Sequence, residues 1–326
     1  QQEESDLHLN PNKRYFPLWV MPVSALLMLD RLITHEEAVK RGLLCKTRPS
    51  ERDPLIYGLV TYKGEDIEVH VLALQFYSHR WLEPSLNPEL AHPDDKDNTK
   101  LKAIKKVAQQ LKNKFENLMR ETGNWRDDGF VWLDFFSIPQ GGDATATRQR
   151  LLAIKSLPNY AHSCGYFIAI IPDVWDEYGM RAWCQSEVVS AAMPKRHPMA
   201  SSLMDAESPN KVMCKLADGS IIGPLDLSKI RNPLECNVTA QEDMVKISTL
   251  VEYFVTELSA FLKWTDLDFE ARNRDRLFGD PRDLPSAEYL QQLAQFRDEF
   301  RAKMYEVLLV VDPEKALRLR LQALRA

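Results

Sequence analysis

The order of apolar segments predicts an α/β fold built on a doubly wound parallel sheet. Between residues 69 and 193, strand-like apolar runs alternate with helical segments. Strands that are separated by helices favour parallel pairing through right-handed crossovers. Two of the runs, Phe130–Phe136 and Cys164–Ile171, have no polar face. Such runs are typical of central strands that are covered on both sides.

The remaining elements of this region follow from residue spacing. Val69–Tyr77 is expected to be the first parallel strand, and it ends at Ser78–Trp81. Asn98–Thr122 carries apolar residues at intervals of three and four, which predicts a long amphipathic helix. Its basic residues, Lys100 to Lys114, are interpreted as the solvated face of that helix. Two further helices are expected at Arg148–Leu157 and Arg181–Met193.

An N-terminal cap, residues 1–66, is expected to precede the α/β domain, residues 67–194. Val23–Leu44 has helical spacing, with Thr34 as an N-cap and Gly42 as a stop. A hairpin is predicted from Ile56–Tyr62 and Ile67–Tyr77, which flank a turn at Lys63–Asp66.

Residues 195–326 are expected to form a C-terminal helical appendage that packs on the core or on a partner. Its first element is a predicted hairpin, Lys211–Leu216 with Ser220–Leu225. Three long helices should follow, at Ala240–Trp264, Ser286–Val311 and Glu314–Arg325.

Composition excludes several classes of function. The net charge of −5 and the pI of about 5.9 provide no basic field, so no nucleic-acid partner is expected. Five cysteines without a C-x-x-C pair predict reduced thiols, a cytoplasmic location and no metal site. The apolar stretch Tyr15–Leu29 contains two prolines and is shorter than the roughly 20 residues of a membrane span. Glycine-rich dinucleotide and P-loop motifs, and the G-x-S-x-G elbow of hydrolases, are absent from the sequence.

Polar residues follow the predicted parallel strands where each strand ends. They are Ser78–Trp81 after the first strand, Asp134 and Ser137–Gln140 with the second, and Pro172–Asp173 after the third. Ligands on open parallel sheets bind beyond the carboxyl ends of the strands. The sequence therefore predicts a ligand site where these three clusters converge.

The same segments resemble landmarks of the Toll/interleukin-1 receptor (TIR) superfamily and of its fungal heterokaryon-incompatibility type. Phe76–Arg80 resembles the first-strand motif F-x-S-x-R, and Val131–Gln140 resembles W-[IL]-D-x-x-x-I-x-Q. Tyr160–Cys164, the strand after it and Trp183–Glu187 resemble the run that ends in W-C-x-x-E. The resemblance covers residues 69–193 and implies a flavodoxin-like sheet.

The resemblance also implies an NAD+ nucleosidase or cyclase activity. NAD+ is the substrate and no cofactor is needed; cleavage of its nicotinamide N-glycosidic bond gives ADP-ribose or a cyclised isomer. Enzymatic TIR domains carry their catalytic glutamate at the position of Glu187. Substrate binding is then expected from six neighbours, namely Ser78, His79, Arg80, Trp81, Asp134 and Trp183. The resemblance further implies self-association into a homo-oligomer and a role in defence or cell-death signalling.

Other interpretations stay open at this point. The chain is also compatible with a non-catalytic TIR-like adaptor, or with a nucleoside deoxyribosyltransferase-like hydrolase. Glu187 alone is compatible with a helix N-terminal turn, and Arg80 with an ion pair to Asp134 or Asp94. Two insertions, one around His92–Asp95 and one around Asp173–Glu177, are long enough to close over the cleft or to block it.

Overall fold

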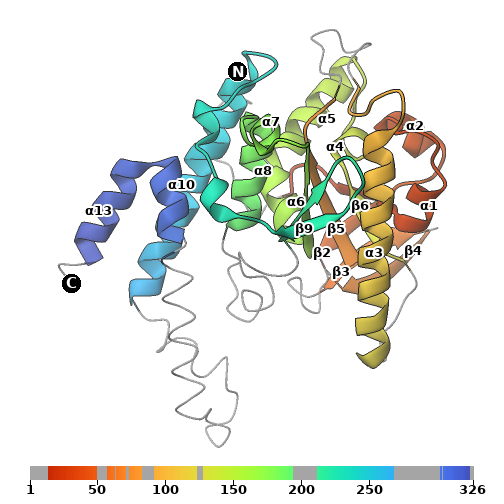
Figure 1. Ribbon diagram of the computed structural model, residues 1–326, viewed down its shortest axis with the longest axis horizontal. Coiled ribbons are helices and arrows are strands. Elements are labelled where there is room, and N and C mark those ends of the chain that lie inside the picture. The colour runs from red at the N-terminus through yellow and green to blue at the C-terminus, as the bar shows by residue number, and fades with distance from the viewer. Residues whose placement is uncertain are drawn as a thin grey trace, which may run out of the picture.

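A single nine-stranded sheet organises the chain (Figure 1). The computed structural model describes residues 14–49, 57–62, 64–70, 73–82, 92–122, 128–193, 211–267, 302 and 304–323. The strand order in the sheet is β4-β3-β2-β1-β6-β5-β7-β8-β9.

The centre of the sheet is parallel, which confirms the α/β class with parallel central strands. The parallel strands are, in spatial order, β6 (Phe130–Trp132), β5 (Leu74–His79), β7 (Tyr166–Ile171) and β8 (Lys211–Lys215). The first of these strands in the chain, β5, lies between the second, β6, and the third, β7. The chain therefore reverses its direction of winding between β5 and β7. At such a switch point the loops part and leave a crevice at the carboxyl ends of the strands.

Antiparallel strands extend the sheet on both sides of this centre. β1 (Leu18–Pro22) pairs with β6, and β2 (Cys45–Pro49), β3 (Tyr57–Tyr62) and β4 (Glu65–His70) follow outward. The β3–β4 hairpin turns at Gly64, whose φ of 85° suits a residue without a Cβ. The hairpin prediction is confirmed, and the N-terminal segment contributes further strands to the same sheet.

Two predicted strands had wrong boundaries. Val69–Tyr77 is divided between β4, which ends at His70, and β5, which begins at Leu74. Phe130–Phe136 is strand only to Trp132, after which Asp134–Ser137 forms the short helix α4. An apolar run that is buried on all sides carries no periodicity, so the sequence does not mark where strand becomes helix.

The hairpin assigned to the C-terminal appendage belongs to the main sheet. β8 pairs with β9 (Ile221–Pro224), and the turn uses Gly219 at a φ of 64°, as expected. However, β8 also pairs in parallel with β7 over Phe167–Ile171. Parallel partners that are far apart in sequence leave no local signal, which is why this pairing was not predicted.

Helices cover both faces of the parallel strands (Figure 1). One face packs against α1 (Val23–Leu27), α2 (His35–Lys40), α3 (Thr99–Thr122) and α4. The other face packs against α5 (Ala144–Lys155), α6 (Leu157–Ser163), α7 (Trp175–Gly179) and α8 (Ala182–Ala192). Outside this layer, α10 (Asp243–Leu267) packs against α8. Two 3-10 turns, η2 (Leu227–Lys229) and η3 (Pro233–Glu235), join β9 to α10.

Several local predictions are confirmed. The Thr34 hydroxyl accepts a hydrogen bond from the Glu37 N–H at the start of α2, and Gly42 adopts a φ of 65° after its end. Residues 304–311 are helical and α13 (Pro313–Ala323) follows, whereas most of the predicted helix Ser286–Val311 lies outside the described residues. Within the described ranges, no helix combines the length and the apolar character that a membrane crossing requires.

Candidate active site

Glu187 lies at the switch point between β5 and β7. It comes from the second turn of α8 and retains 9% of its surface exposure. Its Oε2 accepts a hydrogen bond of 2.5 Å from the hydroxyl of Ser78, the penultimate residue of β5. The Ser78 oxygen also lies 2.5 Å from the Tyr178 hydroxyl. When Glu187 is ionised, Ser78 donates its single proton to the carboxylate, and Tyr178 is then the donor to Ser78.

The surroundings of Glu187 favour its neutral form. Burial raises the pKa of Glu187 well above its usual value, and the nearby negative charge of Asp134 acts in the same direction. The Ser78 hydroxyl opposes this shift, because it donates a hydrogen bond to the carboxylate. No bond to Oε1 is found within the described part of the chain, and Glu187 lines a pocket. A buried carboxyl group with one free oxygen at a pocket is suited to act on a bound ligand.

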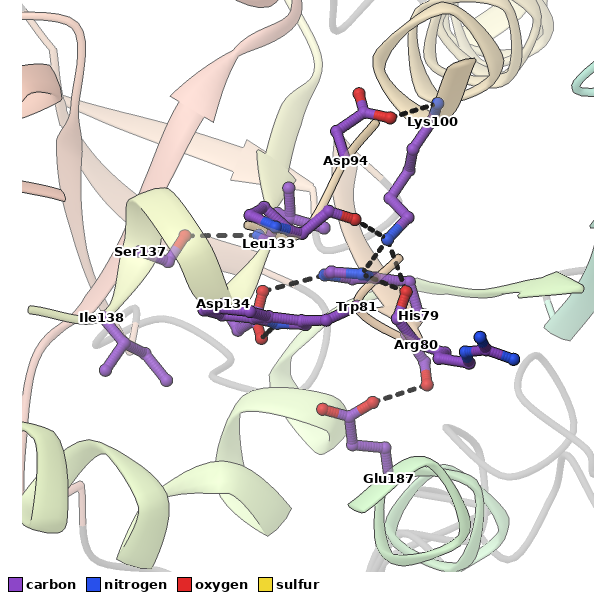
Figure 2. Close-up of polar contacts among 12 residues, drawn as sticks. His79, Arg80, Trp81, Asp94, Lys100, Leu133, Asp134, Ser137, Ile138 and Glu187 are labelled. Atoms are coloured by element: carbon purple, nitrogen blue, oxygen red, sulfur yellow. Dashed lines mark hydrogen bonds and ion pairs between the residues drawn. The ribbon is translucent and has the colours of Figure 1, made fainter. Parts of the chain in front are cut away.

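A second cluster surrounds Asp134, the first residue of α4. Its Oδ1 lies 2.8 Å from His79 Nε2, and its Oδ2 accepts a 2.9 Å hydrogen bond from Trp81 Nε1. Although burial acts to raise the pKa of Asp134, the neighbouring His79 and the two hydrogen bonds lower it overall. Asp134 is thus held as a carboxylate by its neighbours, in contrast to Glu187 (Figure 2).

These groups open into a pocket of about 850 Å³. That volume lies within the range of roughly 300–1,000 Å³ that is usual for small-molecule sites. Flat aromatic walls and guanidinium groups both contribute to it. The aromatic and cationic lining residues are Trp81, His92, Trp132, Phe135, Trp183, Arg31, Arg80, Arg150, Arg181 and Lys246.

Arg80 points away from both of the carboxylates that the sequence suggested as partners. Its Nη1 lies 2.6 Å from Glu177 Oε2, and both side chains are partly exposed. Pairing with Asp134 or Asp94 was therefore the wrong alternative. Arg80 also lines the pocket, so an incoming anion has access to it by competing with Glu177.

Of the predicted site residues, all except Ser78 line the pocket directly, and Ser78 lies behind Glu187. Trp183 is held by a 3.0 Å hydrogen bond from its Nε1 to Asp243 Oδ2, which connects α8 to α10. Gln140 also lines the pocket, with its amide bonded to the Ile138 carbonyl at 2.8 Å. Asp173 is exposed and is not among the lining residues, so the third cluster contributes nothing at this position.

The described part of the first insertion borders the pocket and leaves it open, whereas no residue of the second insertion lines it. His92 lines it, with its ring packed edge-on against Phe135 at 5.3 Å between centroids. The adjacent Asp94 is buried and accepts hydrogen bonds from the backbone N–H groups of Lys100 and Leu101, so it caps the start of α3. The second insertion forms α7, which supplies Tyr178.

Sequence reasoning missed two residues beneath the pocket. Lys100 was interpreted as part of a solvated helix face, and that was wrong because its side chain is 1% exposed. The signal was present, since Lys100 precedes Ile104, Ala108 and Leu111 at intervals of four, four and three on the apolar side of α3. Tyr178 had no such signal, because its contact with Ser78 joins positions 100 residues apart.

No protein-family model matches the chain, and no curated protein or solved structure matches it. The assignment of a function therefore depends on the geometry and the chemistry of these residues.

Proposed function

We propose that the chain is a TIR-like NAD+ nucleosidase that cleaves the bond between nicotinamide and ribose, with Glu187 as its catalytic residue. The observation that carries the proposal is the buried Glu187 carboxyl group, bonded to Ser78 at the switch point and facing a pocket of about 850 Å³. Substrate sites of doubly wound sheets lie at this position.

The sheet supports the TIR-like part of the proposal. Its parallel strands follow the spatial order second-first-third-fourth along the chain, with helices on both faces. That order is the flavodoxin-like one, in which the ligand lies between the first and third strands. Ser78 is the penultimate residue of the first parallel strand here, and α8, which carries Glu187, follows the third. Motif resemblance and strand order thus lead to the same residue.

The chemistry suits a single buried glutamate. NAD+ and water give nicotinamide, ADP-ribose and a proton, and nicotinamide leaves as a neutral base from a cationic precursor. Positive charge then develops on the ribose as an oxocarbenium-like transition state, which a nearby carboxylate stabilises. Because Glu187 favours its neutral form, we expect it to release its proton when the cationic substrate binds or reacts. Burial strengthens the resulting attraction.

The rest of the pocket fits the other half of a dinucleotide. Arg80 and Arg181 lie in the same lining as Glu187 and supply N–H donors for a diphosphate. Trp81 and Trp183, which are both partly exposed, supply flat apolar surface for heteroaromatic rings. A neutral nucleoside would use neither the guanidinium groups nor the full volume, which favours a dinucleotide over the nucleoside-hydrolase alternative.

Release of nicotinamide tests this function. Purified protein at high concentration is incubated with NAD+, and products are separated by chromatography for the wild type, Glu187→Gln and Glu252→Gln. Glu252 is an exposed glutamate of α10 that does not line the pocket, so it is the matched control. We expect nicotinamide from the wild type and the control, and at least a 100-fold lower rate from Glu187→Gln.

Three results would contradict the proposal. Nicotinamide release that survives Glu187→Gln would remove this residue from the chemistry. Free base from nucleosides or nucleoside monophosphates, with little from NAD+, would favour a deoxyribosyltransferase-like hydrolase. Self-association without any release, unchanged in Glu187→Gln, would instead favour a non-catalytic adaptor.

A further inference from the structure

Lys100 is a charged side chain in an unusual position, because it is 1% exposed in the first turn of α3. A buried ammonium group is stable only when its N–H groups are bonded. Its Nζ donates to the backbone carbonyls of Arg80 and Pro93 and lies 2.9 Å from His79 Nδ1. An ammonium has three protons and no acceptor, so these three contacts satisfy it completely.

This contact determines where His79 carries its proton. Because the Lys100 ammonium is a donor, His79 Nδ1 must be the acceptor, and the ring proton must be on Nε2. His79 Nε2 lies 2.8 Å from Asp134 Oδ1, and the proton is therefore directed at that oxygen. Burial lowers the pKa of His79, and so does the Lys100 charge, which both favour the neutral ring.

The position of the His79 proton determines the charge of Asp134. One of its oxygens accepts from His79, and the other accepts from Trp81 Nε1, a group that can only donate. With a donor on each oxygen, Asp134 has no position for an acid proton within these contacts. The Asp134 side chain is 29% exposed and lines the pocket, so its negative charge faces a ligand.

We propose that Lys100 is a positioning residue, which fixes the proton of His79 on Nε2 and thereby holds Asp134 as a negative charge of the pocket beside Glu187. The two carboxyl groups then have different tasks. Asp134 attracts the cationic ring of the substrate, and Glu187 responds to the charge that develops on the ribose. These tasks rest on the proposed function, whereas the placement of the proton does not.

Lys100 also connects the His79–Asp134 pair to the first insertion. Its Nζ bonds the Pro93 carbonyl, and its backbone N–H bonds Asp94 Oδ1 at 2.8 Å (Figure 2). His92, two residues before Asp94, lines the pocket. A substitution at Lys100 is therefore expected to change the shape of the pocket near His92 as well as the charge next to His79. The test consequently needs a readout that is specific for the proton on the His79 ring.

Nitrogen-15 NMR of the histidine rings supplies that readout. The spectrum is recorded at pH 6.5, below the pKa of about 7 that burial gives Lys100. The His79 signals are identified by their loss in His79→Gln. In the wild type we expect one protonated nitrogen, Nε2, and an unprotonated Nδ1. A proton on Nδ1 of the wild type, or a charged ring at this pH, would overturn the proposal without the need for any lysine variant.

A lysine variant tests the cause of the proton's position. Charged and titratable groups around Lys100 Nζ are His79, Asp134, Asp94, Cys184 and Arg80. In Lys100→Met the cation is lost and Asp134 remains, so His79 should become protonated on both nitrogens at pH 6.5. The Arg80 carbonyl, 3.4 Å from Nδ1, is available to accept the second proton. Lys102→Met, at an exposed position of the same helix, is the matched control and should keep the wild-type spectrum.

Ligand binding then tests whether the arrangement of Lys100, His79 and Asp134 matters for the proposed reaction. Calorimetry compares carba-NAD+, an uncleavable analogue with a cationic ring, with NADH, whose ring is neutral. We expect the wild type to prefer the cationic ring, and Lys100→Met to lose about tenfold of that preference, equivalent to about 1.4 kcal/mol. An unchanged preference in a folded Lys100→Met would contradict the role of Lys100. If the NMR result is as expected but neither nucleotide binds, the proton placement stands and the NAD+ function fails.

Discussion

The Ser78 hydroxyl lies 2.5 Å from the Glu187 carboxylate although 109 residues separate them in the chain. β5 supplies the serine and α8 supplies the glutamate, and the two meet where the parallel sheet changes its winding direction. A carboxyl group in this position is costly to ionise in the free protein and becomes favourable beside a cation.

Stability should reveal this cost directly. The pKa of Glu187 is raised above its usual 4.5 in the folded state, so the folded protein binds more protons than the unfolded chain above pH 4.5. The contribution of Glu187 to stability is therefore present below pH 4.5 and is lost as the pH rises through the folded pKa. We expect Glu187→Gln to be more stable than the wild type at pH 7.5, by about 0.5–2 kcal/mol.

Thermal denaturation at pH 4 and pH 7.5 measures this difference. Glu187→Gln should have the higher melting temperature at pH 7.5, and the difference should shrink at pH 4. A variant that is less stable than the wild type at both values would mean that the folded protein stabilises the Glu187 carboxylate, contrary to its surroundings.

Removal of the Ser78 hydroxyl should move the pH dependence of the reaction. Ser78 lowers the pKa of Glu187, so Ser78→Ala should raise that pKa further and move the rising limb of the pH–rate profile to higher pH. At neutral pH we expect kcat/KM for NAD+ to fall about tenfold, or about 1.4 kcal/mol. The control is Ser190→Ala, which removes a fully buried hydroxyl on α8 that donates to the Ser186 carbonyl. If the rising limb of the pH–rate profile stays at the same pH in Ser78→Ala, Ser78 does not affect the pKa of Glu187.

Arg80 should become a better anion contact when its partner is neutralised. Glu177→Gln removes the 2.6 Å ion pair and leaves the guanidinium of Arg80 at the pocket. We expect KM for NAD+ to fall by about two- to fivefold, with a change in stability under about 1 kcal/mol, because both side chains are partly exposed. Asp176→Asn breaks the neighbouring exposed pair with Arg231 and should leave KM unchanged. Equal effects of the two variants would indicate a general change of surface charge.

The cysteines should be unreactive in the native protein. All five are free and buried, and burial raises the pKa of Cys45 and Cys214 to about 12. The pKa of Cys184, at the pocket, is also raised, by burial and then by Glu187. Since the thiolate is the reactive form, we expect labelling by a thiol reagent at pH 8 to require denaturant. Rapid labelling of Cys184 in the native protein would contradict this expectation and would indicate a reactive thiol at the pocket.

The sequence predicted the class of fold well and its boundaries less well. Periodicity identified α3 and α10, because each buries one side of its surface in a helical repeat. The end of β6 at Trp132 and the parallel pairing of β8 had no local signal. The end of β6 and the pairing of β8 both depend on which strands, distant in the sequence, lie next to them. That arrangement is determined by the packing of the whole sheet.

The candidate site was predictable only where its residues lie in recognisable segments. Glu187, Ser78 and Asp134 occur in runs that resemble known motifs, and all three meet at the switch point. Lys100 was misassigned because a lysine on a helix is usually solvated, and the spacing that placed it among apolar residues was outweighed by its charge. Tyr178 lies in an insertion, where no motif exists to identify it.

A crystal structure of Glu187→Gln with NAD+ tests the central claim most directly. This variant removes the charge that the reaction needs and keeps the shape of the side chain, so uncleaved substrate should accumulate in the pocket. The predicted result is the nicotinamide ribose within hydrogen-bond distance of the side chain at position 187, with the nicotinamide ring near Asp134 and the diphosphate toward Arg80 or Arg181. Nucleotide bound elsewhere on the protein, or a ribose on the far side of the pocket from position 187, would contradict the account.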